Sequence, residues 1–383
     1  MHQMNICIAT SSFPHVQSVG TRFGGGGFAL DFAQELAALG HRITVVTSSR
    51  TDASIERVGA IEVIGIPSWF QELAASYLKF SRPGDWGQII SLVFGGCRTL
   101  TRLHKERCFD HVLALWAVPA GLWASYLRFR TGTQFSVWCL GSDIWTYGKL
   151  PILRYAVRGV LRYCRVIFAD GIQLAREAEA LSGKRCLFLP TSRRLHKEWS
   201  EVPHTCTDAE FIFIGRYVAV KGVDVLLEAA AEYVRQGGQW HIAMYGTGPL
   251  AVFLHEKIQA LGLSDVVSIQ GVIGDVDLVQ GIRLSKAVLI PSRQESIPVI
   301  LSDALQLGRP VIVSDVGDMG ALVRGYHAGI VVPPGDSHAL AEAMLAMEHI
   351  EREDFAAGID SLNQLFDVST TAKTWLSYVD HLE

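Results

Sequence analysis

The chain has 383 residues, of which 49% are hydrophobic and 19% charged, and its formal net charge is −4. This length suits two domains of ordinary size, each with its own core. The composition excludes a disordered chain and is typical of a globular α/β protein.

Short apolar strands alternate with helical patterns throughout, which predicts βαβ units and parallel sheets. In the first half the predicted strands are Asn5–Thr10, Ile43–Thr47, Ile61–Ile66, His111–Leu115, Phe135–Trp138, Val166–Ala169 and Cys186–Leu189. In the second half they are Glu210–Ile214, Trp240–Tyr245, Val266–Gln270, Ala287–Pro291, Pro310–Ser314 and Gly329–Val332.

A polar stretch over 196–209 predicts the domain boundary. We expect an N-terminal Rossmann-like domain over 1–200 and a C-terminal one over 201–366, followed by a helical segment, 367–383. Two such sheets in tandem face each other across a cleft between their carboxyl-terminal strand ends, where α/β folds bind ligands.

The apolar run His111–Leu127 approaches the length of a membrane span. Pro119 and Gly121 interrupt the run, and a strand followed by a helix explains it as well, so we expect no membrane-spanning helix. The seven cysteines are scattered without a C-x-x-C pair, which is typical of reduced thiols. No secretory signal pattern opens the chain, and we expect a cytoplasmic protein.

Two turns that follow predicted strands carry glycines or charges. Gly24–Gly27 precede a helix, where free amides favour a phosphate, although a flexible turn explains them equally. Arg216 and Lys221 follow the first strand of the second domain, and both can reach one diphosphate. Alternatively, they are solvated surface cations.

The segment PSRQESIPVILSDALQLGRPVI places Glu295 after a strand and Asp303 eight residues later. About two helical turns would bring both carboxylates to one side, where they can accept hydrogen bonds from sugar hydroxyls. Ser296 is the expected helix cap, and the first free N–H groups of that helix can face a phosphate. The alternative is a capped helix with an ordinary solvated acid.

These segments resemble glycosyltransferase family 4. GRYVAVKGVD resembles its G-R-x(4)-K-G-x-D signature, and PSRQESIPVILSDALQLGRPVI resembles its P-S-x-x-E-x-F-G-x(4)-E-A segment. GTGPL, GIVVPPGD and FGGGGFALDFAQELAALGHRITVVT match three further stretches in the same order, so the resemblance covers nearly the whole chain.

The resemblance implies a GT-B fold and a retaining transfer of a sugar from a nucleoside diphosphate donor, without a metal or other cofactor. Arg216, Lys221 and the amides of Gly25 and Gly26 would then hold the diphosphate. Glu295 would bind the transferred sugar, Asp303 the ribose, and the turn with Gly246 and Gly248 would lie near the base.

Three departures from the family's pattern stand out. Asp303 replaces a Glu, and Ile297-Pro298 replace Phe-Gly. Pro298 has no N–H, which leaves those of Val299 and Ile300 for a donor phosphate. In WCLGSDIW, Leu140 stands where the family has His, and Asp143 remains as a candidate acceptor contact and catalytic residue.

The acceptor side is basic. Residues 1–200 hold 23 Lys and Arg against 14 Asp and Glu, a charge of +9, whereas residues 201–383 hold 11 against 24, a charge of −13. Two stretches, one with Arg154, Arg158, Arg162 and Arg165, the other with Arg98, Arg102, Lys105 and Arg107, suggest peripheral attachment to an anionic membrane. Helices with an ordinary solvated face explain them as well.

The sequence therefore predicts a glycosyltransferase that uses a glycan or lipid-linked acceptor in polysaccharide or glycoconjugate synthesis. Nucleic acid is not an expected partner, because aromatic residues are not interleaved with the basic ones as in RNA-binding proteins. Two alternatives remain open: a sugar-nucleotide epimerase or hydrolase on the same fold, and a non-catalytic nucleotide-sugar-binding subunit. The helical segment Thr371–Leu382 is expected to dock back on the N-terminal domain.

Overall fold

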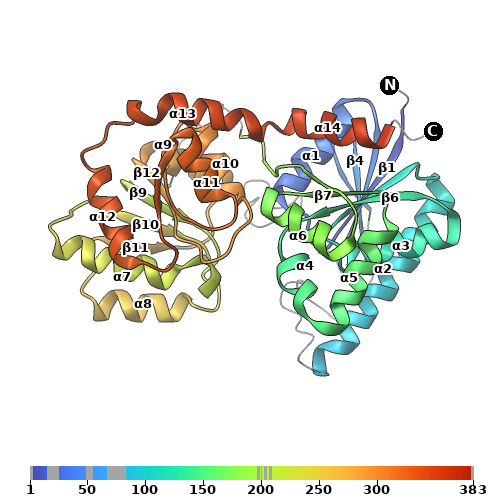
Figure 1. Ribbon diagram of the computed structural model, residues 1–383, viewed down its shortest axis with the longest axis horizontal. Coiled ribbons are helices and arrows are strands. Elements are labelled where there is room, and N and C mark those ends of the chain that lie inside the picture. Colours follow the sequence, from blue (N-terminus) through green and yellow to red (C-terminus); the bar gives the residue numbers. More distant parts are fainter. Residues whose placement is uncertain are drawn as a thin grey trace. The chain divides into compact units, whose positions relative to one another are not determined.

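The computed structural model describes residues 3–14, 26–48, 55–66, 83–195, 199, 201, 205–206 and 209–380. The chain divides into two compact units (Figure 1). The first unit comprises the described residues up to Pro190 and those from Val368 onward; the described residues of the second lie within Thr191–Asp367. The first division precedes the polar stretch in which a boundary at 200 was expected, because residues 193 and 195 already bond to the second unit.

The first unit contains an eight-stranded sheet in the order β3-β4-β2-β1-β5-β6-β7-β8. Its strands are β1 (Asn5–Thr10), β2 (Arg42–Thr47), β3 (Ile55–Val58), β4 (Ile61–Gly65), β5 (His111–Leu115), β6 (Gln134–Cys139), β7 (Val166–Ala169) and β8 (Cys186–Phe188). All neighbours pair in parallel except β3, which is antiparallel to β4. The central strands are almost wholly buried, as a sheet covered on both faces requires.

Helices cover both faces of this sheet. Their bounds are α1 (Gly27–Ala38), α2 (Trp86–Arg107), α3 (Ala120–Thr131), α4 (Ser142–Trp145), α5 (Pro151–Tyr163), α6 (Ile172–Ser182) and α14 (Val368–Asp380). Two short turns, η3 (Pro83–Asp85) and η4 (Tyr147–Lys149), precede α2 and α5. One core cluster joins the sheet to α2, α3, α5 and α6, and a second joins it to α1 and α14.

The apolar run from His111 forms β5 and α3, as the strand-and-helix alternative predicts. None of the helices within the described ranges is long and apolar enough to cross a membrane.

The second unit contains a six-stranded parallel sheet in the order β11-β10-β9-β12-β13-β14. Its strands are β9 (Phe211–Ile214), β10 (Ile242–Tyr245), β11 (Val267–Gln270), β12 (Ala287–Ile290), β13 (Val311–Ser314) and β14 (Gly329–Val332). Every strand predicted from the sequence is present, with ends that differ by at most two residues.

The helices of the second unit alternate with its strands. They are α7 (Val223–Arg235), α8 (Ala251–Ala260), α9 (Asp275–Leu284), α10 (Val299–Gln306), α11 (Met319–Tyr326), α12 (Ser337–Met347) and α13 (Glu353–Asn363), with short turns η6 (Ala219–Lys221) and η7 (Gln364–Phe366). Helix α7 packs against α8 and α12, and α13 packs against α10 and α11.

Candidate functional site

The candidate site lies at the carboxyl ends of three neighbouring strands of the second unit. In the order β10-β9-β12, the chain proceeds from β9 to β10 on one side and reaches β12 on the other. This is a topological switch point, where the loops after adjacent strands turn apart and leave room for a ligand. The loops after β9, β10 and β12 carry the residues that the sequence singles out.

Arg216 lies on the turn after β9. Its neighbour Tyr217 is buried, and the Tyr217 hydroxyl donates to the carbonyl oxygens of Met244 and Gln270 at 2.7 and 3.0 Å. The Arg216 side chain is exposed, and it pairs with no carboxylate within the described residues. A rigid turn therefore presents a free guanidinium at the strand end.

Lys221 and Glu295 meet across the switch point. The Lys221 ammonium donates to the Glu295 carboxylate, and the Ser292 hydroxyl donates to the same oxygen at 3.2 Å. Both members of the pair are partly open, with 22% and 16% of their side chains exposed. An ammonium has three donors, so Lys221 can contact Glu295 and a phosphate oxygen together.

Arg293, which the sequence analysis did not single out, fixes the loop that carries Glu295. Its guanidinium forms a bidentate pair with Asp224 at 2.6 and 2.8 Å and donates to the Ala219 carbonyl oxygen at 2.7 Å. The hydrogen bond from Arg293 lowers the pKa of Asp224. The Asp of the GRYVAVKGVD segment therefore joins the β9 and β12 loops. No sequence signal connects the two residues, because they lie far apart in the chain.

The glycines of the site allow close backbone contacts. A Cβ at Gly246 would lie 1.9 Å from the Gly215 carbonyl oxygen, and one at Gly248 would lie 2.5 Å from that of Tyr217. Both have a φ near +155°, which side-chain-bearing residues rarely adopt. The turn after β10 is thus seated directly against the turn that carries Arg216.

Helix α10 begins at Val299, with Pro298 as its N-cap. Because Pro298 has no N–H, the first free amides are those of Val299 and Ile300, both half-buried. The expectation that Ser296 caps this helix is wrong. Its hydroxyl is buried and has no hydrogen-bond partner among the described residues.

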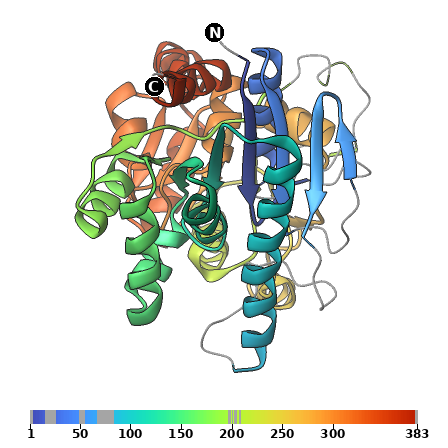
Figure 2. The ribbon, with the colours of Figure 1, turned by 90° about the vertical axis from the view of Figure 1, so that its right-hand side faces the viewer.

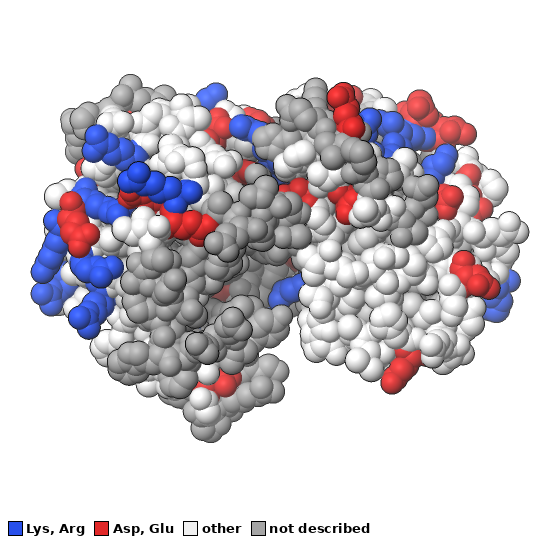
Figure 3. Space-filling view, turned by 180° about the vertical axis from the view of Figure 1, so that it is seen from behind, with Lys and Arg blue, Asp and Glu red and all other residues white. Residues whose placement is uncertain are grey.

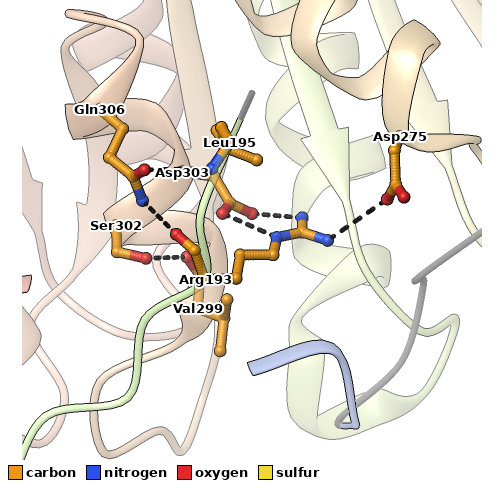
Figure 4. Close-up of polar contacts among 7 residues, drawn as sticks. All are labelled: Arg193, Leu195, Asp275, Val299, Ser302, Asp303 and Gln306. Atoms are coloured by element: carbon orange, nitrogen blue, oxygen red, sulfur yellow. Dashed lines mark hydrogen bonds and ion pairs between the residues drawn. The ribbon is translucent and has the colours of Figure 1, made fainter. Parts of the chain in front are cut away.

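Asp303 and Glu295 have different partners, and the helical spacing on which their predicted common side depended is not present. Helical periodicity does not extend to Glu295, because the helix starts only at Val299. Asp303 is fully buried, and its two oxygens accept from the Nε and Nη2 atoms of Arg193, the former at 2.8 Å (Figure 4). Burial raises the pKa of Asp303, and the Arg193 charge opposes the rise. In this geometry the Asp303 carboxylate accepts hydrogen bonds from Arg193, and it is not exposed to accept them from sugar hydroxyls.

Arg193 is a site residue that the sequence analysis missed. Its Nη1 also lies 4.0 Å from the Asp275 carboxylate, and its carbonyl oxygen accepts from the Gln306 amide at 2.8 Å (Figure 4). The chain entering the second unit is thereby fastened to α10, whose first turn bears Val299 and Ile300.

In the first unit the predicted residues have mainly structural contacts. Asp143 is fully buried, and its carboxylate accepts from the amides of Ala117, Leu140 and Ile144 at 3.0, 3.3 and 3.2 Å. The predicted acceptor contact therefore does not fit this geometry, in which Asp143 holds together the loops after β5 and β6. Gly26 is the N-cap of α1, and Gly25 lies outside the described residues. No group of three or more metal-binding side chains occurs in the described ranges.

A family model described as "Glycosyl transferases group 1" matches residues 197–358. The phosphatidyl-myo-inositol mannosyltransferase of Mycobacterium leprae is 30% identical over 354 residues, which cover 90% of this chain and 89% of that protein. The alpha-D-kanosaminyltransferase of Streptomyces kanamyceticus is 34% identical over 133 residues, which cover 35% of this chain and only 34% of that protein.

Solved structures share the fold at low identity. A sucrose-phosphate synthase from Thermosynechococcus elongatus aligns with a TM-score of 0.81 at 17% identity, over 99% of both chains. The Anabaena protein HepE in complex with UDP-glucose aligns with a TM-score of 0.72 at 16% identity, over 99% of this chain and 100% of that one. These likenesses confirm the predicted fold class, two Rossmann-like parallel-sheet domains of the GT-B type.

Proposed function

Because the chain belongs to the family of group 1 glycosyl transferases, we propose that it transfers a sugar from a nucleoside diphosphate donor, with retention at the anomeric carbon. One observation carries this proposal. The exposed Arg216, the Lys221–Glu295 pair and the start of α10 flank a single switch point. Cations and free amides at such a point suit a diphosphate, and a carboxylate beside them suits a sugar.

Each residue has a separate role in the proposed reaction. Arg216 forks onto the diphosphate, and Lys221 adds a point charge while it keeps its contact with Glu295. The Val299 and Ile300 amides face the phosphate that carries the growing charge, and Glu295 accepts from hydroxyls of the transferred sugar. As the sugar–phosphate bond breaks, an acceptor hydroxyl oxygen bonds to the anomeric carbon and its proton passes to the departing diphosphate. The same groups stabilise the departing nucleoside diphosphate, so no metal or other cofactor is required.

The proposed acceptor is a glycan or a lipid-linked saccharide, in the synthesis of cell-surface polysaccharide or glycoconjugate. Two observations support it: a relative that aligns over 90% of this chain is named a phosphatidyl-myo-inositol mannosyltransferase, and residues 1–200 carry a charge of +9. The proposed location is the cytoplasm, with peripheral attachment at the inner face of the membrane.

Thermal unfolding against UDP-, GDP- and ADP-sugars tests the donor site. A donor at a hundred times its dissociation constant adds about 2.7 kcal/mol to the free energy of unfolding, which raises the midpoint by several degrees. We expect one nucleotide class to stabilise the protein, and Arg216→Ala and Lys221→Ala each to abolish that shift.

Lys257→Ala is the matched control, because Lys257 also pairs with a glutamate and is exposed to a similar extent, 20% against 22% for Lys221. Its donor-induced shift should equal that of the wild type. A flat response of the wild type to every donor would contradict the proposal. Nucleotide release without any acceptor would indicate an epimerase or hydrolase, and donor binding without turnover a non-catalytic subunit.

A further inference from the structure

Helices α2, α3 and α5 form one continuous layer on a face of the first unit, with α3 between the other two (Figure 2). Gly96 of α2 packs directly on the Trp123 ring, where a Cβ would lie 2.2 Å from the indole. Between α3 and α5, the Arg128 guanidinium lies 4.7 Å from the centre of the Tyr163 ring and donates to the Tyr163 carbonyl oxygen. The outer surface of these three helices is therefore a single face, here called the helical face.

The helical face is strongly cationic. Neither α3 nor α5 contains an Asp or Glu, and α2 contains only Glu106. On α5, Arg154, Arg158 and Arg162 recur at four-residue steps and are all exposed. Favourable contact with the negative ends of helices explains cations in the last turn, but not Arg154 or Arg158. Viewed from behind, Lys and Arg gather along the outer edge of the first unit, with few Asp and Glu among them (Figure 3).

Two cations of the predicted basic stretches do not belong to the helical face. Arg107 bonds to Thr44 at 2.9 Å and pairs with Glu62. Arg165 lies beyond α5, where its amide donates to the Phe135 carbonyl oxygen.

The helical face also carries highly exposed apolar side chains. The four most exposed large hydrophobic side chains all lie on its helices: Phe129 (77%), Ile152 (76%), Tyr155 (74%) and Phe94 (73%). Single exposed apolar residues are common, but four such residues on one cationic layer are not explained by chance exposure. Ile152 and Tyr155 lie beside the arginine row of α5, so apolar and cationic groups are presented together.

We infer that the helical face docks on an anionic phospholipid bilayer, with Phe129, Ile152 and Tyr155 entering the headgroup region and the arginines contacting lipid phosphates. Both kinds of side chain on this face fit a lipid surface. Cations are attracted to anionic headgroups, and aromatic and branched apolar side chains partition into the membrane interface. A soluble polyanion would use the cations alone. The inference rests on the proposed function in one respect only: a lipid-linked acceptor would be present at such a membrane.

Cosedimentation with vesicles tests the inference, using phosphatidylcholine alone and phosphatidylcholine with about one third phosphatidylglycerol. The wild type should bind only the anionic vesicles, and less as salt is raised. The charge variant combines Arg154→Gln, Arg158→Gln and Arg162→Gln. It should bind about 100-fold more weakly, from the contribution expected of three surface cations. Its control replaces three exposed arginines of the second unit: Arg235→Gln, Arg283→Gln and Arg324→Gln.

An apolar variant separates a bilayer from a soluble polyanion. It combines Phe129→Ser, Ile152→Ser and Tyr155→Ser, and should bind anionic vesicles at least about 10-fold more weakly. The inference is overturned if the wild type ignores anionic vesicles at low salt, if the control arginine set matters as much, or if the apolar variant binds like the wild type. The last result would indicate a soluble polyanion. Donor-induced stabilisation of the same variants should be unchanged, so its loss would count against the donor site and not against the helical face.

Discussion

At the scale of single residues, the buried contact between Arg193 and Asp303 is the feature that least resembles a ligand-binding site. One guanidinium lies between two buried carboxylates, those of Asp303 and Asp275. Removing such groups from water is costly, and only their mutual attraction and hydrogen bonds offset the cost. The pair therefore adds little net stability to the fold. Its main effect is to fix the place where the chain enters the second unit.

Replacing one partner should be far worse than replacing both. Arg193→Met leaves a buried carboxylate without its counter-charge, so we expect the free energy of unfolding to fall by about 3–5 kcal/mol. The double variant Arg193→Met with Asp303→Leu should recover part of this loss, because the Asp303 charge is removed together with its partner, whereas the buried Asp275 carboxylate still loses a nearby cation. Denaturant unfolding of the two single variants and the double variant measures the coupling. Equal losses in the single and double variants would contradict it.

The double variant also decides whether Asp303 has the ribose role that the family resemblance implies. Our interpretation of the geometry predicts that a folded double variant keeps its donor-induced stabilisation, because Asp303 bonds to Arg193 in the wild type. A well-folded double variant that no longer responds to any donor would instead make Asp303 a ligand.

The site was predictable from the sequence where local order decides it. Arg216, Lys221 and Glu295 follow strands, and parallel strand ends meet at one edge of a sheet, so their proximity follows from the pattern. Arg193 was not predictable, since its partner lies 110 residues away. The Glu295–Asp303 interpretation failed because the eight-residue spacing was treated as helical throughout, whereas half of it is loop.

At the scale of elements, the strand alternation was almost sufficient to predict both sheets. The exception is β3, which carries Glu56 and Arg57 and pairs with β4 at the edge of its sheet. Such short edge strands lack the buried apolar run that reveals central ones. Helix α14 contacts the first unit through Trp375, which is fully buried and donates to the Ser136 hydroxyl at 3.2 Å. Its ring also lies edge-on to those of Phe32 and His111.

The docking of α14 should weaken in acid because of His111. Burial, with a smaller effect of the Arg165 charge, lowers the pKa of His111 from 6.5 to about 3. Between these values the unfolded chain binds a proton that the folded chain does not, so the free energy of unfolding falls as pH drops below about 6.5. Above that pH the histidine is neutral in both states, and its contribution is constant.

The measurement is denaturant unfolding from pH 7.5 to 4.5, for the wild type and for His111→Gln. Other histidines with lowered pKa values, such as His41 and His241, contribute to both curves, so the difference between the proteins isolates His111. The wild-type curve should fall more steeply below pH 6.5. Parallel curves would show that His111 is protonated without cost in the folded state.

At the scale of the whole molecule, the two proposed functions lie on different compact units. The described donor-site residues Arg216, Lys221, Glu295 and the start of α10 belong to the second unit, whose described residues all lie between Thr191 and Asp367. The helical face belongs to the first unit, which is completed only by the C-terminal α14. The order of the chain therefore makes one unit separable by simple truncation and the other not.

This division predicts how fragments of the protein behave. A fragment of residues 191–367 should fold and be stabilised by the same nucleotide sugar as the whole chain, without binding anionic vesicles, because its six-stranded sheet and donor loops are complete. A fragment of residues 1–190 lacks Trp375, and Phe32 and His111 lose the buried ring against which they pack, so it should be poorly folded. Joining residues 368–383 to it by a flexible linker should restore folding and vesicle binding.

Circular dichroism, donor titration and cosedimentation test each fragment. Vesicle binding by 191–367, or donor binding by the linked first unit alone, would show that the two functions are not divided in this way.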